Sequence, residues 1–191
     1  MALFYLDASA LVKLVREESE SAALNTFIED ADLVSSELVL TEIPRAIRRA
    51  AADDPELSLG QLIEQANDVL DSLATVPVDQ AVLVAAGGLP EPALRALDAI
   101  HVATALSLSP VDAFVTYDER QGAAARLAGL RTVMPTAQAI PSDSEDVAEP
   151  SKPKITRSTP AELASRIKAR GTPAPSQPSE ITVREIRDHG E

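Results

Sequence analysis

The sequence predicts an α/β domain with a mostly parallel sheet over residues 1–135. Short apolar runs, typical of buried strands, alternate along the chain with longer segments whose apolar residues recur at helical spacing. Alternation of this kind builds a parallel sheet with helices on both faces. Hydrophobic residues make up 45% of the 191 residues, enough for a packed core. Aromatic residues are only 3%, so Leu, Val, Ile and Ala must form that core.

Each element follows from its local pattern. Leu3–Leu6 is a short apolar run suited to a buried strand, and apolar residues at helical spacing follow Asp7 directly. Further strands are expected at residues 32–36, 112–118 and 130–134. Further helices are expected at residues 21–30, 37–52, 59–73, 80–86 and 91–108, with a last one ending near 128.

The chain changes character after Pro135. Seven of its 14 prolines fall in the last 56 residues, and we expect residues 136–158 to form a Pro-rich acidic linker. The stretch "TPAELASRIKARG" then predicts one short helix, with Thr159 and Pro160 at its start and Gly171 at its end. The sequence thus divides into a domain and an extended tail.

Composition excludes several kinds of chemistry. The chain has no Cys, which rules out disulfides, thiolate metal sites and cysteine nucleophiles. The N-terminus lacks the basic region of a signal peptide, and no apolar stretch reaches the roughly 20 residues of a membrane span. We therefore expect a cytoplasmic protein that does not contact a membrane.

The net charge of −13 argues against nucleic-acid binding through a broad basic face. Residues 1–135 carry 21 acidic and nine basic side chains, whereas residues 136–191 carry nine and eight. An acidic domain can still act on a polyanion if a divalent metal ion neutralises its site.

Four carboxylates stand where the predicted fold could bring them together. Asp7 and Asp118 end two strands, Glu42 lies early on a helix, and Asp98 interrupts an otherwise apolar helix. The carboxyl ends of parallel strands form the ligand-binding edge of an open sheet. Taken singly, Asp7 and Asp118 could be helix caps and Glu42 a solvated residue. Asp98, expected in mid-helix and buried, could simply be paired with Arg95 or His101.

As a set, these acids indicate a site for a hard divalent cation. Mg²⁺ prefers carboxylate and water oxygens, and the chain holds only two His and no Cys for a zinc site. Metal held by carboxylates can activate water for phosphodiester hydrolysis. The non-catalytic alternative is an acidic module that binds a basic partner.

Four motifs carry a resemblance to a known family. "YLDASALVKL", "LVSSELVLTEIPRAIRR", "LRALDAIHVATALSL" and "FVTYDER", in this order, resemble PIN-domain ribonucleases, and above all the VapC-type toxins of toxin–antitoxin pairs. The resemblance covers residues 1–135. It implies a three-layer α/β/α sandwich, usually a homodimer, that cleaves structured RNA with Mg²⁺ or Mn²⁺.

The resemblance also assigns roles to residues. The catalytic acids would be Asp7, Glu42, Asp98 and Asp118, with Asp7, Asp98 and Asp118 as metal ligands and Ser9 and Thr116 as supporting hydroxyls. His101 is interpreted as structural. Candidate phosphate contacts, each of which could instead belong to a solvated helix face, are Lys13, Arg16, Arg45, Arg48, Arg49 and Arg120. A housekeeping RNA-processing nuclease is an alternative to a toxin.

The tail carries a weaker likeness. Residues 159–191, and "ITRSTPAELASRIKARGTPAP" in particular, resemble the toxin-binding segment of an antitoxin. This implies a domain restrained either by a cognate antitoxin or by its own C-terminal segment, with Arg166, Lys168 or Arg170 neutralising the acidic site. The alternative is a disordered tail with no such role.

Overall fold

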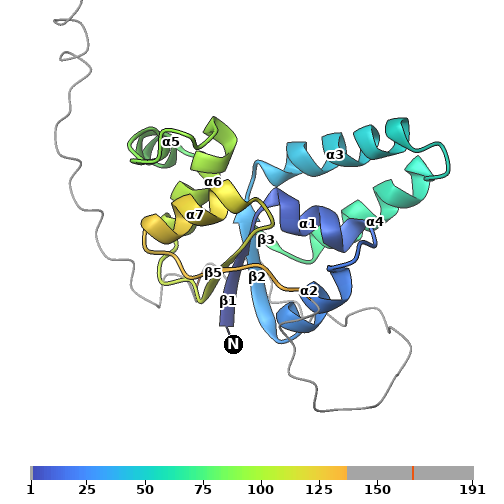
Figure 1. Ribbon diagram of the computed structural model, residues 1–191, viewed down its shortest axis with the longest axis horizontal. Coiled ribbons are helices and arrows are strands. Elements are labelled where there is room, and N and C mark those ends of the chain that lie inside the picture. Colours follow the sequence, from blue (N-terminus) through green and yellow to red (C-terminus); the bar gives the residue numbers. More distant parts are fainter. Residues whose placement is uncertain (1, 137–164, 166–191) are drawn as a thin grey trace, which may run out of the picture.

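The computed structural model describes residues 2–136 and Ser165. Within residues 2–136 the chain forms five strands and seven helices (Figure 1). The strands are β1 (Ala2–Leu6), β2 (Ala31–Ser36), β3 (Ala74–Val76), β4 (Ala113–Val115) and β5 (Thr132–Val133). The helices are α1 (Ala8–Val15), α2 (Ser21–Ile28), α3 (Val39–Asp53), α4 (Leu59–Asp71), α5 (Gln80–Gly87), α6 (Ala96–Ser107) and α7 (Glu119–Leu127).

The sheet is parallel throughout, in the order β3-β2-β1-β4-β5. The chain begins in the central strand, adds β2 and β3 on one side, and then returns to add β4 and β5 on the other. The strand order therefore reverses between β1 and β4. The carboxyl ends of strands at such a reversal are where open α/β sheets bind ligands. Here Leu6, the last residue of β1, pairs with Val115, the last residue of β4. The residues that follow these two strands therefore lie at the reversal.

Two apolar cores cover the two faces of the sheet, because successive side chains of a strand point to opposite faces. Phe4 and Leu6 pack in one core with residues of α1, α2, α3 and α4. Leu3 and Tyr5 pack in the other with residues of α6 and α7. Figure 1 shows the same division, with α5, α6 and α7 on one side and α1, α3 and α4 on the other. The predicted α/β/α sandwich with a parallel sheet is confirmed.

Two details of the prediction were wrong. Strand β3 was missed, because three residues before Pro77 are too few to show a periodic pattern. Helix α6 begins at Ala96 rather than near residue 91, after a turn in which the Leu94 N–H donates to the Glu91 carbonyl. Asp98 therefore lies in the first turn of α6, half-buried, and not in a buried mid-helix position. A helix N-terminus is a favourable place for a carboxylate.

The tail assignments lie outside this structure. Apart from Thr136, the linker at 136–158 falls outside the described residues, and so does the segment at 159–191 apart from Ser165. The same holds for Arg166, Lys168 and Arg170. No helix in the part of the chain that the structure describes is long and apolar enough to cross a membrane.

Candidate active site at the carboxyl edge of the sheet

Asp7 joins β1 to α1 and is nearly fully buried, with 4% of its surface exposed. It is the N-cap of α1, and its Oδ1 accepts the Ala10 N–H at 2.9 Å. Ser9 Oγ lies 2.7 Å from the same oxygen, and Thr116 Oγ1 lies 2.8 Å from Oδ2. Burial raises the pKa of Asp7, while these hydrogen bonds act against the rise. The cap expected from the sequence is present, and it holds a carboxylate that is costly to ionise.

Ser9 and Thr116 connect the ends of β1 and β4. Ser9 Oγ donates to Asp7 and accepts the Tyr117 N–H at 2.7 Å. Thr116 Oγ1 lies 2.8 Å from both Asp7 Oδ2 and Gln121 Oε1, and it accepts the Asp118 N–H at 3.0 Å. The two hydroxyls predicted to support the site therefore do contact Asp7.

Asp118 follows β4 and caps α7. Its Oδ1 accepts the N–H groups of Arg120 at 2.9 Å and Gln121 at 3.0 Å. These bonds, together with the Arg120 guanidinium 3.6 Å from Oδ2, lower the pKa of Asp118. Unlike Asp7, Asp118 is therefore held in its charged form.

A glycine lets α7 approach the sheet at this point. A Cβ on Gly122 would lie 3.3 Å from Thr132 Cγ2 and 3.4 Å from Thr116 Cγ2. These distances leave little room for a methyl group, so a side chain here would require Thr132 or α7 to shift by a few tenths of an ångström. The absence of a side chain at Gly122 therefore lets α7 pack closely against Thr116 and Thr132.

Asp98 reaches the same edge from the opposite core. The side-chain amide of Gln121 donates to the Asp98 carbonyl at 3.5 Å, which links α6 to α7. Burial is the main cause that raises the pKa of Asp98, and the negative charge of Asp118 raises it further. Glu42 adds a smaller repulsion, while Arg95 and His101 act in the opposite direction. Asp98 thus lies in the combined field of two other predicted site acids.

Glu42 is held by a buried chain of hydrogen bonds. Its Oε2 lies 2.8 Å from His101 Nε2, and His101 Nδ1 lies 2.8 Å from the Tyr5 hydroxyl. His101 and Tyr5 are 1% and 0% exposed. Burial raises the pKa of Tyr5 far above its usual range, so the hydroxyl keeps its proton and can donate to Nδ1. Nε2 then carries the imidazole hydrogen and donates to Glu42.

The sequence predicts a structural role for His101, but it does not predict that His101 contacts Tyr5 and Glu42. The available signal was weak: one His on an apolar helix, and one Tyr in a strand about a hundred residues away along the chain. Nothing local in either segment predicts that they meet. The contact arises because α6 packs on the face of β1 that carries Tyr5.

Together, the four acids lie around the strand-order reversal, although they do not form a closed ligand cluster. Among the residues that the structure describes, no three His, Cys, Asp or Glu side chains are grouped so that they could hold a metal ion. Asp7 and Asp118 use their oxygens as helix caps. The arrangement is an acidic edge at which burial raises the pKa of Asp98 most, and the charges of Asp118 and Glu42 raise it further.

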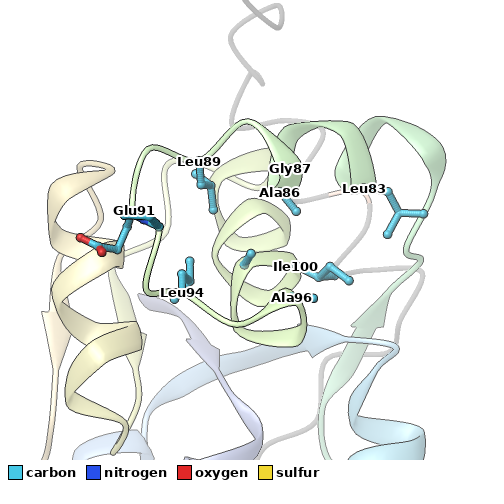
Figure 2. Close-up of a pocket in the computed structure, with 10 residues that line it drawn as sticks. Leu83, Ala86, Gly87, Leu89, Glu91, Leu94, Ala96 and Ile100 are labelled. Carbon is cyan, nitrogen blue, oxygen red and sulfur yellow. The ribbon is translucent and has the colours of Figure 1, made fainter. Parts of the chain in front are cut away.

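A hollow of about 490 Å³, lined mainly by apolar residues, lies between α5, α6 and the loop that connects them (Figure 2). Leu83 comes from α5, Leu89 and Leu94 from the connecting loop, and Ile100 from α6. Among the described residues that line it, Glu91 alone is charged. Ala96 and Ala99 of its wall flank Asp98 in the sequence, so α6 contributes to both the hollow and the acidic edge.

Two of the six candidate phosphate contacts are already paired. Lys13 Nζ lies 2.6 Å from Glu18 and 2.9 Å from Glu20, and it also lies over the Tyr117 ring. Arg120 pairs with Asp118. Within residues 2–136, the ion pairs found include none from Arg45, Arg48 or Arg49.

The parallel sheet with acidic residues at its carboxyl edge is the arrangement of a PIN domain. The sequence matches the PIN domain model over residues 4–127, and the chain belongs to this family. A solved structure, PAE2754 from Pyrobaculum aerophilum, has the same fold, with a TM-score of 0.51 and 22% identity. The match covers 69% of this chain and 84% of the PAE2754 chain.

Relatives with higher identity place the chain among the VapC-type members. It is 38% identical over 139 residues to ribonuclease VapC35 of Mycobacterium tuberculosis, which covers 70% of this chain and 97% of that protein. It is 39% identical over 139 residues to ribonuclease VapC46 of the same organism, covering 71% of this chain and all of that protein. These relatives are thus matched almost end to end, and the rest of this chain lies outside them.

The opposite environments of Asp7 and Asp118 predict opposite effects on stability. Above the usual carboxyl pKa, Asp7 ionises readily in the unfolded chain but less readily in the folded chain, where burial raises its pKa. The stability that the protonated carboxyl contributes is therefore lost as pH rises through the raised pKa. Asn keeps the helix cap and does not titrate. Between about pH 4 and pH 7, the free energy of unfolding of Asp7→Asn should therefore rise relative to that of the native chain.

Asp118→Asn is the matched control with the opposite sign. The lowered pKa of Asp118 gives stability that is present above the usual carboxyl pKa and lost as pH falls. This variant should be less stable than the native chain at neutral pH, with the difference shrinking toward about pH 3. Urea midpoints across the pH range measure both effects. A shift of the same sign for both variants would contradict the assignment.

Proposed function

We propose that this protein is a toxin endoribonuclease that cleaves structured RNA, such as tRNA or ribosomal RNA, with a divalent metal ion. The observation that supports this most is the group of acids at the carboxyl edge of a PIN fold, where the pKa of Asp98 is raised by burial and further by the charges of Asp118 and Glu42. The VapC relatives bear the name ribonuclease, which favours RNA as the substrate. The protein would act in the cytoplasm, where such RNA is found.

The donor chemistry of the edge fits Mg²⁺ or Mn²⁺. The acids offer only oxygen ligands, which hard divalent ions prefer, and the repulsion at Asp98 is what a bound cation would relieve. Asp7, Asp98 and Asp118 would hold the ion, after their carboxylates turn toward one another from the positions seen here. Such an ion supplies charge neutralisation and an activated water for attack on a phosphodiester.

In this proposal the residues of the chain bind and orient. Ser9 and Thr116 hold the Asp7 carboxylate in place through two hydroxyl contacts. Glu42, held by His101, positions or deprotonates the attacking water at the rim of the edge. Asp118 stays ionised near neutral pH because the N–H groups of α7 stabilise its charge.

The first test is cleavage of total RNA by the full chain and by residues 1–136, with Mg²⁺ and with EDTA. Metal-dependent cleavage is expected, and Asp98→Asn should reduce it ~100-fold or more, since a lost metal contact costs several kcal/mol of transition-state stabilisation. Asp68→Asn, on an exposed position of α4, is the matched control and should cleave like the native chain. Equal cleavage in EDTA, or by the Asp98 variant, would contradict the proposal.

The His101 contact predicts a difference between two amide variants. Gln places a donor near the position of Nε2 and so can keep the bond to Glu42, whereas Asn reaches only the position of Nδ1. His101→Gln should keep most of the cleavage rate, and His101→Asn should lose about 10- to 100-fold, the usual range for a residue that orients another. Thermal unfolding of both checks that stability is comparable. Equal losses in both variants would mean that His101 serves the fold alone.

We further propose that a cognate antitoxin or the protein's own C-terminal segment restrains this site. Residues 159–171 carry Arg166, Lys168 and Arg170 with Leu163 and Ile167. That combination is chemically matched to α6, which contributes both to an apolar hollow and to the acidic edge. Tethering would give an effective concentration on the order of millimolar. We also propose a homodimer, which sedimentation analysis would test.

Removing the tail charges in the full chain should release the activity. The variant R166Q/K168Q/R170Q is expected to cleave RNA about tenfold faster or more, because a tethered contact at millimolar effective concentration is weakened. The control K152Q/K154Q/R157Q removes three positive charges from the linker instead and should change nothing. If both variants cleave like the native chain, the tail does not restrain the domain through these residues.

A further inference from the structure

Three arginines form an exposed basic surface on α3. Arg45, Arg48 and Arg49 line a hollow of about 410 Å³, and among the described residues they are its only lining. All three are exposed, and they make up a third of the nine basic residues in positions 1–135. In a domain with 21 acidic side chains, such a concentration of unpaired positive charge is a local exception.

The arginine surface continues from the acidic edge. Glu42 lies in the first turn of α3, and Arg45 and Arg49 follow it at i+3 and i+7, which share a helix face with it. The opposite face of α3, with Val39, Ile43 and Ile47, is buried in the core. Figure 1 shows that α3 starts beside the sheet and extends outward past its edge. Arg45 and Arg49 therefore lead from Glu42 away from the site in two steps of about one turn, roughly 5.4 Å each, and Arg48 lies next to Arg49.

Arginine also has the right chemistry for this place. Its guanidinium stays charged at all accessible pH values and can bind a phosphate through two N–H groups at once. The arginines have no ion-pair partner within residues 2–136, whereas Lys13 and Arg120 are each held by carboxylates. Within residues 2–136, no ion pair has to be broken before these guanidinium groups contact a ligand.

We propose that Arg45, Arg48 and Arg49 bind the phosphates of the RNA strand that flanks the cleavage point. This inference rests on the proposed ribonuclease function, since it takes Glu42 as part of the site that holds the scissile bond. An acidic protein segment would also suit three arginines. RNA is favoured because an RNA strand bound at Glu42 must extend away from the acidic edge. Helix α3 offers it positive charge in an otherwise acidic surrounding.

Binding of fluorescent RNA by the full chain tests the surface, measured in EDTA so that no cleavage occurs. The variant R45Q/R49Q should bind an oligonucleotide of roughly a dozen nucleotides about tenfold more weakly or worse at low salt. The slope of log affinity against log salt should fall by about 1.4, because each phosphate contact on a single strand contributes ~0.7. Gln is a good helix former, so α3 should remain intact.

The control R126Q/R131Q removes the same charge from exposed positions at α7 and before β5. It should keep the native affinity and salt slope. A trinucleotide, too short to reach past Glu42, should bind native chain and R45Q/R49Q alike. If R45Q/R49Q binds the long RNA with native affinity and slope, or if the native chain binds no RNA at low salt, the proposal is overturned. The first result would leave room for an acidic protein partner.

Failure of this proposal differs from failure of the ribonuclease function. Metal-dependent cleavage by both native chain and R45Q/R49Q with the same KM would overturn the arginine surface and leave the nuclease. Absence of cleavage from the native chain and from residues 1–136 would instead overturn the nuclease.

Discussion

The structure depends on one buried carboxylate, that of Asp7. It lies where the strand order reverses, at the end of the central strand, and the site at this edge is arranged around it. Transfer of a carboxylate from water into a protein interior is costly unless hydrogen bonds replace the lost hydration. Ala10, Ser9 and Thr116 provide them, from α1 and from the end of β4. The same contacts that make burial tolerable also fix β1, α1 and β4 relative to one another.

This arrangement places acids with opposite tendencies within one site. Burial disfavours the charge on Asp7 and Asp98, while the N–H groups of α7 favour the charge on Asp118. In a site of this kind, each ionised carboxylate makes ionisation of the next one more costly, and a nearby positive charge lowers that cost. The long-range contact of Glu42 with His101 adds a fourth acid whose orientation is set from inside the core. The proposed cation binding would therefore be coupled to fold stability at this edge.

Sequence patterns predicted the parts of the fold that local physics determines. The caps at Asp7 and Asp118 and the first turn around Glu42 follow from residue type and position alone. Strand β3 and the start of α6 could not be found in this way, because β3 is short and the start of α6 depends on a turn. The link from Tyr5 through His101 to Glu42 joins three segments that are distant in sequence. Packing alone decides that contact, and a single sequence carries no pattern for it.

The acidity of the domain is compatible with RNA when charge is considered locally. The Debye length at physiological salt is ~8 Å, so distant surface carboxylates contribute little at any one phosphate. What a strand meets is the field within that distance, and this differs between the acidic edge and the outer part of α3. In the proposed complex, acidic surroundings would act as a constraint on direction, because they disfavour a polyanion where the surface carries no basic side chains. A net charge of −13 thus argues against broad, non-specific RNA binding and leaves room for one narrow path to a site.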